Sequence, residues 1–423
     1  MGCKLFRRQS SRVPLGVALS FAQELQKYLE SLPEVLNVSL AGSARRWKET
    51  VGDIDLVVST REPNKVAEQF VKHPRLSHIL EQASDRILAC SHLGIKVELI
   101  QVPPEEFNLT VFRDTGSKAH WLHLEQVLAE HGIIPELVQG SSVEEFEKGV
   151  YAALGLAYIP PELREDQGEI EAAVQGQLPQ LIELGDIKGD LHVHTNWSDG
   201  IHTLSQMADA ARARGYEYIA ITDHSKSLRI THGLSEKRVL EQRKLIDQYN
   251  REHPDFRVLA GIEVDILSNS ALDYPDDFLK DMDIVIASVH TGFKQDQERL
   301  TERILTALKN EHVDILAHPT GRLLGRRAPY PLDLEEVLEV AAATQTAVEI
   351  NASPDRLDLD AANSRCLMER GGLLAINTDA HDCRHLTDME FGVMTARRGW
   401  VEKNSVINSW PLKKLQRWLN KGK

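Results

Sequence analysis

Short apolar runs alternate with amphipathic stretches through the second half of this chain. The amphipathic stretches, such as ERLTERILTALKNE, repeat apolar residues at helical spacing. The apolar runs lie at about residues 190–194, 218–223, 258–264, 284–290, 314–318, 347–351 and 373–378. Strands alternating with helices in this way predict a parallel barrel over residues 189–423, whose active site lies at the carboxyl ends of the strands.

Residues of metal-ligand type stand at or just beyond the ends of almost all these runs. They are His192, His194, Asp199, His224, Glu263, His290, His318, Asp379 and His381. The period of two of a strand places His192 and His194 on the same side. A single histidine at a strand end is more often structural, but nine ligands at successive strand ends predict a metal cluster. We expect Asp223 to orient a histidine instead of binding metal.

The predicted cluster suits phosphoester chemistry. Mixed imidazole and carboxylate ligands favour Mn²⁺ or Zn²⁺ over Ca²⁺ or Mg²⁺. Up to three divalent ions would outweigh the charges of Asp199, Glu263 and Asp379, so the filled site would attract a phosphate. Two ions about 3.5–4 Å apart can activate a water and stabilise the leaving oxygen.

The strings GDLHVHTNWSDG, ITDHS, AGIEVDIL, SVH, HPTGRLLGRR and NTDAH resemble the PHP (polymerase and histidinol phosphatase) domain, in the version fused to bacterial family X DNA polymerases. The resemblance covers about residues 189–410. It implies a distorted (β/α)7 barrel, a trinuclear site made by the same nine residues, and 3′–5′ exonuclease and related 3′-end activities that work best with Mn²⁺. We expect Arg229, which follows ITDHS, and Arg322, Arg326 and Arg327, which follow His318 in HPTGRLLGRR, to contact DNA phosphates.

The first half carries a second group of acidic residues, in AGSARRWKETVGDIDLVV. Asp53 and Asp55 point the same way on a predicted strand and can share Mg²⁺ ions that carry a nucleotide. A third carboxylate, Glu98, comes from the predicted strand KVELI.

The loop before these carboxylates is suited to binding phosphate. Gly42 permits a tight turn, so that Ser43 and the backbone amides can approach phosphate oxygens. Arg46 can add a bidentate donor, and the three residues form the candidate nucleotide-binding set.

These features resemble the nucleotidyltransferase palm of family X DNA polymerases, over residues 13–103. The resemblance implies a small thumb over 104–164 and a linker over 165–188, ahead of the PHP domain at 189–423. The expected fold is therefore an α+β palm and thumb followed by an α/β barrel.

The palm departs from the family pattern in several places. Glu98 stands where the family's third carboxylate is normally Asp, Arg113-Asp114 replaces Tyr-Phe, and Trp121 replaces an Asn that contacts the nucleotide. RVPLGVALSFAQELQKYL resembles the segment that joins the fingers to the palm, so we expect the lyase and helix–hairpin–helix regions to be missing. These departures predict a palm that is weak or inactive in DNA synthesis.

Composition restricts the partners and the compartment. The formal net charge of −14 means that DNA must be bound through local basic patches or metal ions. No apolar stretch approaches the roughly 18 residues that span a bilayer, and no apolar core follows the basic start MGCKLFRRQSS. The four cysteines are far apart, which is typical of a reducing compartment. We therefore predict a cytoplasmic protein with no membrane partner.

The predicted function is a Mn/Zn-dependent phosphoesterase that processes DNA 3′ ends in DNA repair. Three alternatives stay open: a gap-filling DNA-directed nucleotidyltransferase that uses dNTP and Mg²⁺, a small-molecule PHP phosphatase, and a non-catalytic binder of DNA ends. Substitutions of Asp53 and Asp379 distinguish the phosphoesterase from the nucleotidyltransferase, because each residue belongs to one site only. Loss of activity on substitution of Asp379 indicates the former, and loss on substitution of Asp53 indicates the latter. Comparison of an oligonucleotide with histidinol phosphate separates the second, and metal binding without hydrolysis would favour the third.

Overall fold

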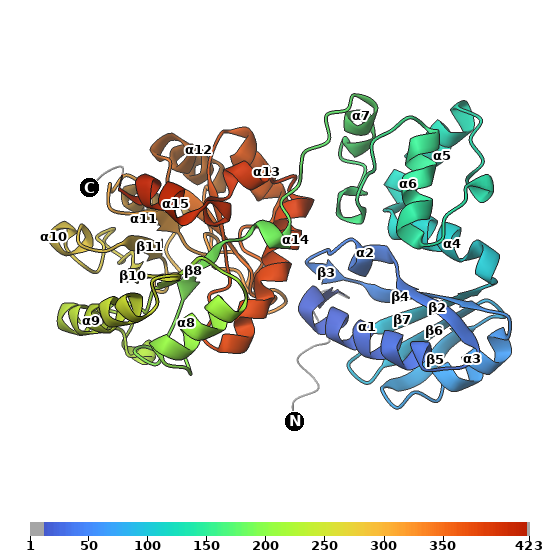
Figure 1. The fold of residues 1–423 in the computed structure, drawn as a ribbon, viewed down its shortest axis with the longest axis horizontal. Helices are drawn as coiled ribbons and strands as arrows, with labels where there is room; N and C mark the ends of the chain where they lie inside the picture. Colours follow the sequence, from blue (N-terminus) through green and yellow to red (C-terminus); the bar gives the residue numbers. More distant parts are fainter. Residues whose placement is uncertain (1–11, 421–423) are drawn as a thin grey trace. The chain divides into compact units, whose positions relative to one another are not determined.

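The computed structural model describes residues 12–420, so the N-terminal string MGCKLFRRQSS lies outside the described residues. The chain divides into two compact units, Met1–Leu178 and Pro179–Lys423 (Figure 1). Within residues 12–420 no helix is long and apolar enough to cross a membrane. Cys90, Cys366 and Cys383 are free thiols.

Parallel strands form the centre of the second unit. They are β8 (Gly189–Val193), β9 (Tyr218–Ile221), β10 (Arg257–Asp265), β11 (Ile284–Ser288), β12 (Ile315–Leu316), β13 (Ala347–Asn351) and β14 (Leu374–Asn377). They are hydrogen-bonded in chain order as one sheet of seven strands. The sheet nearly closes, since a parallel bridge joins Val193 to Ala380 and the His194 amide donates to the Ala380 carbonyl at 2.9 Å. The predicted seven-stranded parallel barrel is confirmed.

Helices follow the barrel strands and bury apolar faces against them. The helices are α8 (Leu204–Ala213), α9 (Glu236–Glu252), α10 (Asp276–Leu279), α11 (Gln297–Leu308), α12 (Leu334–Thr344), α13 (Ala361–Glu369), α14 (Met389–Arg398) and α15 (Leu412–Leu419). Most of the longer ones begin at a capping side chain; Asp296, for example, accepts from the Arg299 amide and so satisfies one of the free amides of the first turn. Ile304 of α11 and Val337 of α12 pack with Val285 of β11 in one buried cluster.

The first unit contains a mixed sheet in the order β2-β4-β7-β6-β5 (Figure 1). Its strands are β2 (Val35–Leu40), β4 (Asp53–Thr60), β5 (Leu76–Gln82), β6 (Arg86–Ser91) and β7 (Lys96–Val102). β4 and β7 pair in parallel, and the other pairs are antiparallel. The sequence pattern did not predict β5 and β6. β5 is an edge strand whose side chains are mostly exposed and lack clear alternation, whereas β6 does alternate, with Ile87, Ala89 and Ser91 buried.

Helices and a small strand pair complete this unit. β1 (Val13–Pro14) pairs with β3 (Thr50–Val51). The helices are α1 (Leu15–Glu30), α2 (Gly42–Arg45), α3 (Pro63–Phe70), α4 (Phe107–Thr115), α5 (Lys118–Glu130), α6 (Val143–Ala153) and α7 (Glu169–Val174). Segment 165–188, expected as a linker, contains α7, and the Glu169 carboxylate contacts His120 Nδ1 of α5 at 2.6 Å. Its first part is therefore packed within the first unit.

Candidate metal centre

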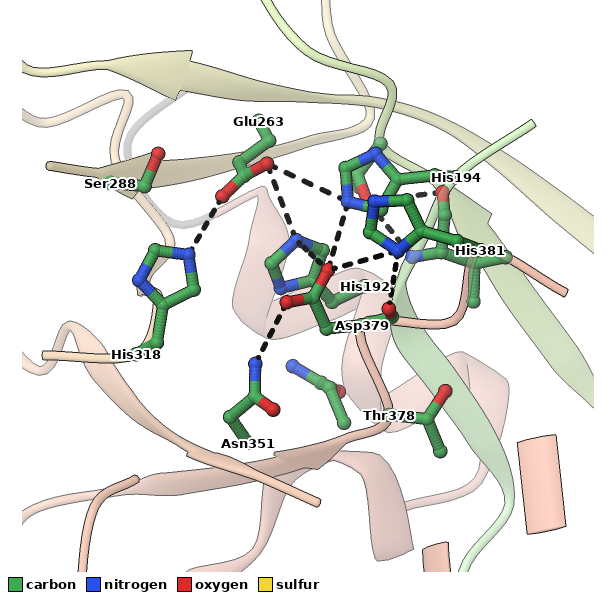
Figure 2. Close-up of polar contacts among 12 residues, drawn as sticks. His192, His194, Glu263, Ser288, His318, Asn351, Thr378, Asp379 and His381 are labelled. Carbon is green, nitrogen blue, oxygen red and sulfur yellow. Dashed lines mark hydrogen bonds and ion pairs between the residues drawn. The ribbon is translucent and has the colours of Figure 1, made fainter. Parts of the chain in front are cut away.

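The nine predicted ligand residues converge at the carboxyl ends of the barrel strands, and several of them surround Glu263 and Asp379 in Figure 2. His192 lies on β8 and Glu263 on β10, while His290 and His318 follow β11 and β12 by two residues each. The parallel order of the strands brings these side chains together although they are far apart in the sequence.

Glu263 lies at the centre of the cluster and is almost completely buried. Its carboxylate oxygens face ring nitrogens of His224 at 2.7 Å, His318 at 3.1 Å, His290 at 3.4 Å, His192 at 3.5 Å and His194 at 3.6 Å. A carboxylate that faces five imidazoles could help to hold a divalent cation together with those rings.

Asp379 and Asp199 extend the cluster on the other side. Asp379 Oδ1 lies 3.1 Å from His194 Nε2 and 3.7 Å from His381 Nδ1. Asp199 lies 3.3 Å from His381 Nε2 and 3.5 Å from His224 Nε2. His194 and His224 therefore each stand between two carboxylates.

The donor set fits divalent cations. Three overlapping groups bring their ligand atoms within 4.8 Å of one another: His194–Asp199–His224–His381, His192–His194–Glu263 and His224–Glu263–His290. Among the described residues, no group hydrogen-bonds to the buried His192 Nε2, either ring nitrogen of His194, or Glu263 Oε2. Buried polar atoms are rarely left unsatisfied, so their arrangement around one point is typical of a metal site.

The charges of the site control its protons. Burial by itself would lower the pKa of His224, but Glu263 and Asp199 outweigh it and raise that pKa to about 10. Burial would also lower the pKa of His381, but Asp199 and Asp379 outweigh it and raise that pKa to about 9. Burial, with the nearby charges of His381 and His224, lowers the pKa of His194 to about 3. Without metal, His224 and His381 thus carry protons at neutral pH.

We therefore expect metal binding to release protons at pH 7, and metal affinity to rise as the pH is raised toward 9–10, because fewer protons must then be displaced from His224 and His381. Calorimetric titration of the metal-free protein with Mn²⁺, in two buffers of different ionisation enthalpy, measures the released protons. A heat that is the same in both buffers, with an affinity independent of pH, would contradict this expectation.

Two carboxylates that sequence analysis did not select hold the histidines in place. Glu349 of β13 is fully buried and lies 2.7 Å from His192 Nδ1, so it leaves Nε2 for a metal. Asp265 of β10 lies 2.7 Å from His290 Nδ1 and so leaves His290 Nε2 for a metal. The period of two that connects Glu263 with Asp265 was an available signal for Asp265. Glu349 gave no local signal, because its partner is 157 residues away.

The role of Asp223 differs from the expectation that it orients a histidine. Its carboxylate accepts from the Thr195 amide at 2.8 Å, from the Thr195 hydroxyl at 2.6 Å, from Gln242 at 2.6 Å and from the Ser198 hydroxyl. These bonds fix the loop that carries Asp199. Asp223 therefore positions the predicted ligand Asp199 through the backbone of its loop.

The four arginines expected to contact phosphate lie in different environments. Arg229 is exposed, and Arg326 is exposed with its guanidinium 3.4 Å from Asp355. Arg322 is buried, and its Nε donates to the Arg356 carbonyl at 3.0 Å. This bond gives Arg322 a structural role in the loop after β13. Arg327 is exposed, and its guanidinium lies over the Phe293 ring.

The three candidate carboxylates of the palm, Asp53, Asp55 and Glu98, lie on the paired strands β4 and β7. Asp55 and Glu98 are direct neighbours in the register. Burial, followed by the charges of Asp53 and Glu98, raises the pKa of Asp55 to about 7. Glu98 also forms an ion pair with Arg86 at 3.0 Å.

The loop before these carboxylates is tight, as expected. Gly42 has a φ of 56°, and a Cβ at this position would lie 1.7 Å from Asp55 Oδ2. Only glycine fits there. Ser43 is half-buried in the short helix α2, while Arg46 is buried and bonds to Glu165 at 2.9 Å and to the Thr115 carbonyl at 2.7 Å. These bonds connect Arg46 to the end of α4 and to Glu165, which follows Arg164.

Comparison with known proteins agrees with this architecture. The PHP domain family model matches residues 190–353. A DNA polymerase/3′-5′ exonuclease PolX of Bacillus subtilis (strain 168) is 41% identical over 425 residues, which covers 98% of this chain and 74% of that protein. A probable phosphatase of Thermoanaerobacter sp. (strain X514) is 29% identical over 231 residues, 52% of this chain and 89% of the phosphatase. A probable phosphatase of Shewanella piezotolerans is 31% identical over 218 residues, 48% of this chain and 82% of the phosphatase.

The barrel, the clustered imidazoles and carboxylates, and the phosphatase relatives together define the class: the chain is an enzyme, a metal-dependent hydrolase with a PHP phosphoesterase domain. The similarity to the Bacillus protein extends through both units. The chain belongs to the PolX family.

Proposed function

We propose that this protein is a Mn²⁺- or Zn²⁺-dependent 3′–5′ exonuclease that processes DNA 3′ ends in the cytoplasm as part of DNA repair. The proposal is carried by the cluster of nine predicted ligand side chains, with Glu263 and Asp379 at its centre, in a PolX-family chain. The name of the Bacillus relative includes a 3′-5′ exonuclease, which supports DNA as the substrate.

The proposed ligands are the nine residues of the cluster, and up to three ions can be shared among them. Bound divalent ions would lower the pKa of a water and polarise phosphoryl oxygens. The chain supplies the rest: Glu349 and Asp265 hold the rings of His192 and His290 with one nitrogen facing the centre. Asp223 holds the loop of Asp199, so that the site is set before the substrate arrives.

For the first unit we propose a nucleotidyltransferase palm over 13–103 and a thumb over 104–164, which retain at most weak DNA synthesis. Asp53 and Asp55 with Glu98 form the proposed Mg²⁺ site, where burial, followed by the nearby carboxylates, raises the pKa of Asp55 to about 7. Weak synthesis is supported by the longer Glu98 side chain, whose carboxylate pairs with Arg86 at 3.0 Å. Small misplacements of reacting groups cost on the order of a hundredfold in rate.

A gel assay tests both parts of the proposal. A 5′-labelled primer annealed to a longer template is incubated with Mn²⁺, with and without dNTPs. We expect shortening of the primer from its 3′ end, loss of that activity in Asp379→Asn, and unchanged shortening in Asp53→Asn, because the two residues belong to separate units. Histidinol phosphate in a parallel reaction measures phosphatase activity.

Three results would contradict the proposal. Vigorous primer extension that Asp53→Asn abolishes would favour the polymerase alternative. Fast hydrolysis of histidinol phosphate with no shortening of the primer would favour a small-molecule phosphatase. Bound metal without hydrolysis of either substrate would favour a binder of DNA ends.

A further inference from the structure

Arg356 lies beside the metal centre, on the loop that follows β13. Its Nε is 3.7 Å from Asp379 Oδ2. The histidines of the cluster contact the other oxygen, Oδ1, so Arg356 approaches Asp379 from the opposite side. Arg356 Nη1 is buried, and none of the groups in residues 12–420 hydrogen-bonds to it. A buried cationic donor without an acceptor is costly, so this nitrogen is suited to an anion that comes from outside the chain.

The loop holds Arg356 in one position. Arg322 donates through Nε to the Arg356 carbonyl at 3.0 Å and through its other nitrogen to the Leu357 carbonyl. Leu357 has a φ of 46°, in the left-handed region that a branched side chain avoids. Two hydrogen bonds between Asn351 and Asp358, at 2.6 and 3.3 Å, close the loop. The guanidinium is therefore positioned before any ligand binds.

A second cation, Arg327, lies on the loop after β12, and this loop contacts the loop of Arg356, since the Leu324 amide donates to the Asp355 carbonyl at 2.7 Å. Its guanidinium lies 4.8 Å from the centre of the Phe293 ring, and its Nε donates to the Gly321 carbonyl at 2.8 Å. Burial and the neighbouring charge of Arg356 lower the pKa of Arg327. Two like charges that feel each other repel, and an anion between them relieves that repulsion.

We propose that Arg356 and Arg327 form a second anion subsite beside the metal centre, which holds the phosphate one nucleotide inward from the scissile phosphate of a DNA strand. This inference rests on the proposed exonuclease function. The scissile phosphate belongs among the imidazoles and carboxylates, whereas Arg356 faces the outer side of Asp379. A small phosphomonoester has no second phosphate, so the subsite favours a nucleic-acid strand over such substrates.

The test combines a change in the substrate with a change in the protein. Two 5′-labelled oligonucleotides are compared, one natural and one in which only the inward phosphate is a neutral methylphosphonate. We expect the wild type to cleave the neutral substrate about ten- to a hundredfold more slowly, the usual effect of losing a charged hydrogen bond. Arg356→Gln should lose a similar factor on the natural substrate and show no further loss on the neutral one.

Matched variants keep the test decisive. Arg327→Gln should behave like Arg356→Gln and serves if the latter fails to fold. Arg251→Gln, an exposed arginine at the end of α9, should keep the wild-type difference between the substrates. Metal content, measured on each variant, should equal that of the wild type.

The outcomes separate the subsite from the function on which it rests. Equal wild-type rates on both oligonucleotides would overturn the subsite while leaving the exonuclease intact. The subsite would also be overturned if Arg356→Gln cleaved the neutral substrate more slowly than the natural one by the same factor as the wild type. Arg356 would then act through a group other than the inward phosphate. Failure of the wild type to cleave any oligonucleotide would refute the exonuclease itself and the subsite with it.

Discussion

Glu263→Gln is expected to lower the rate of the proposed 3′–5′ exonuclease about a thousandfold, or ~4 kcal/mol of activation free energy. The substitution keeps the size of the side chain and removes the charge that faces five imidazoles, the nearest at 2.7 Å. Those imidazoles lose their shared partner, and the site loses a carboxylate that would help to hold the cations. The rate on a 5′-labelled oligonucleotide and the metal content of the purified protein should fall together.

The matched control for Glu263 is Glu298→Gln, which changes an exposed carboxylate in the first turn of α11. This variant should keep both metal and rate. Circular dichroism checks that Glu263→Gln is folded. Normal metal content and a normal rate in a folded Glu263→Gln protein would remove Glu263 from the proposed ligand set.

Glu349→Gln is expected to weaken metal binding or activity by about ten- to a hundredfold, the range found when a carboxylate that orients a metal-binding histidine is removed. Glu349 contacts His192 Nδ1 at 2.7 Å and also accepts from the His318 amide at 2.8 Å and from Asn377 at 3.0 Å. A glutamine can offer its amide nitrogen to His192 and thereby disturb the ring. Titration of the metal-free protein with Mn²⁺ measures the loss.

A merely structural role for Glu349 would give a different result. Saturating Mn²⁺ should restore much of the activity of Glu349→Gln if the residue orients His192, because weaker binding is overcome by concentration. Unchanged Mn²⁺ affinity, with a rate that excess metal does not restore, would contradict the orienting role.

The barrel was predictable because its pattern is local. Each strand is a short apolar run followed by an amphipathic helix, and ligand residues such as His290 and His318 end their runs. A periodic signal within some 20 residues is enough to place such a residue at a strand end. In the first unit β5 was missed, because an exposed edge strand has no buried face to mark it.

The chain's sequence by itself determined the class of fold and the candidate ligands, since strand order in a parallel barrel follows chain order. Only the tertiary structure decided which other side chains orient the candidate ligands and hold the loops beside them. Glu349 meets His192 across 157 residues, and Arg322 holds the loop of Arg356 from 34 residues away. Asp379 and His318 adopt φ values of 55° and 27°, a conformation that long-range contacts must enforce. Local pattern carries no information on such contacts, because they form only when the barrel closes.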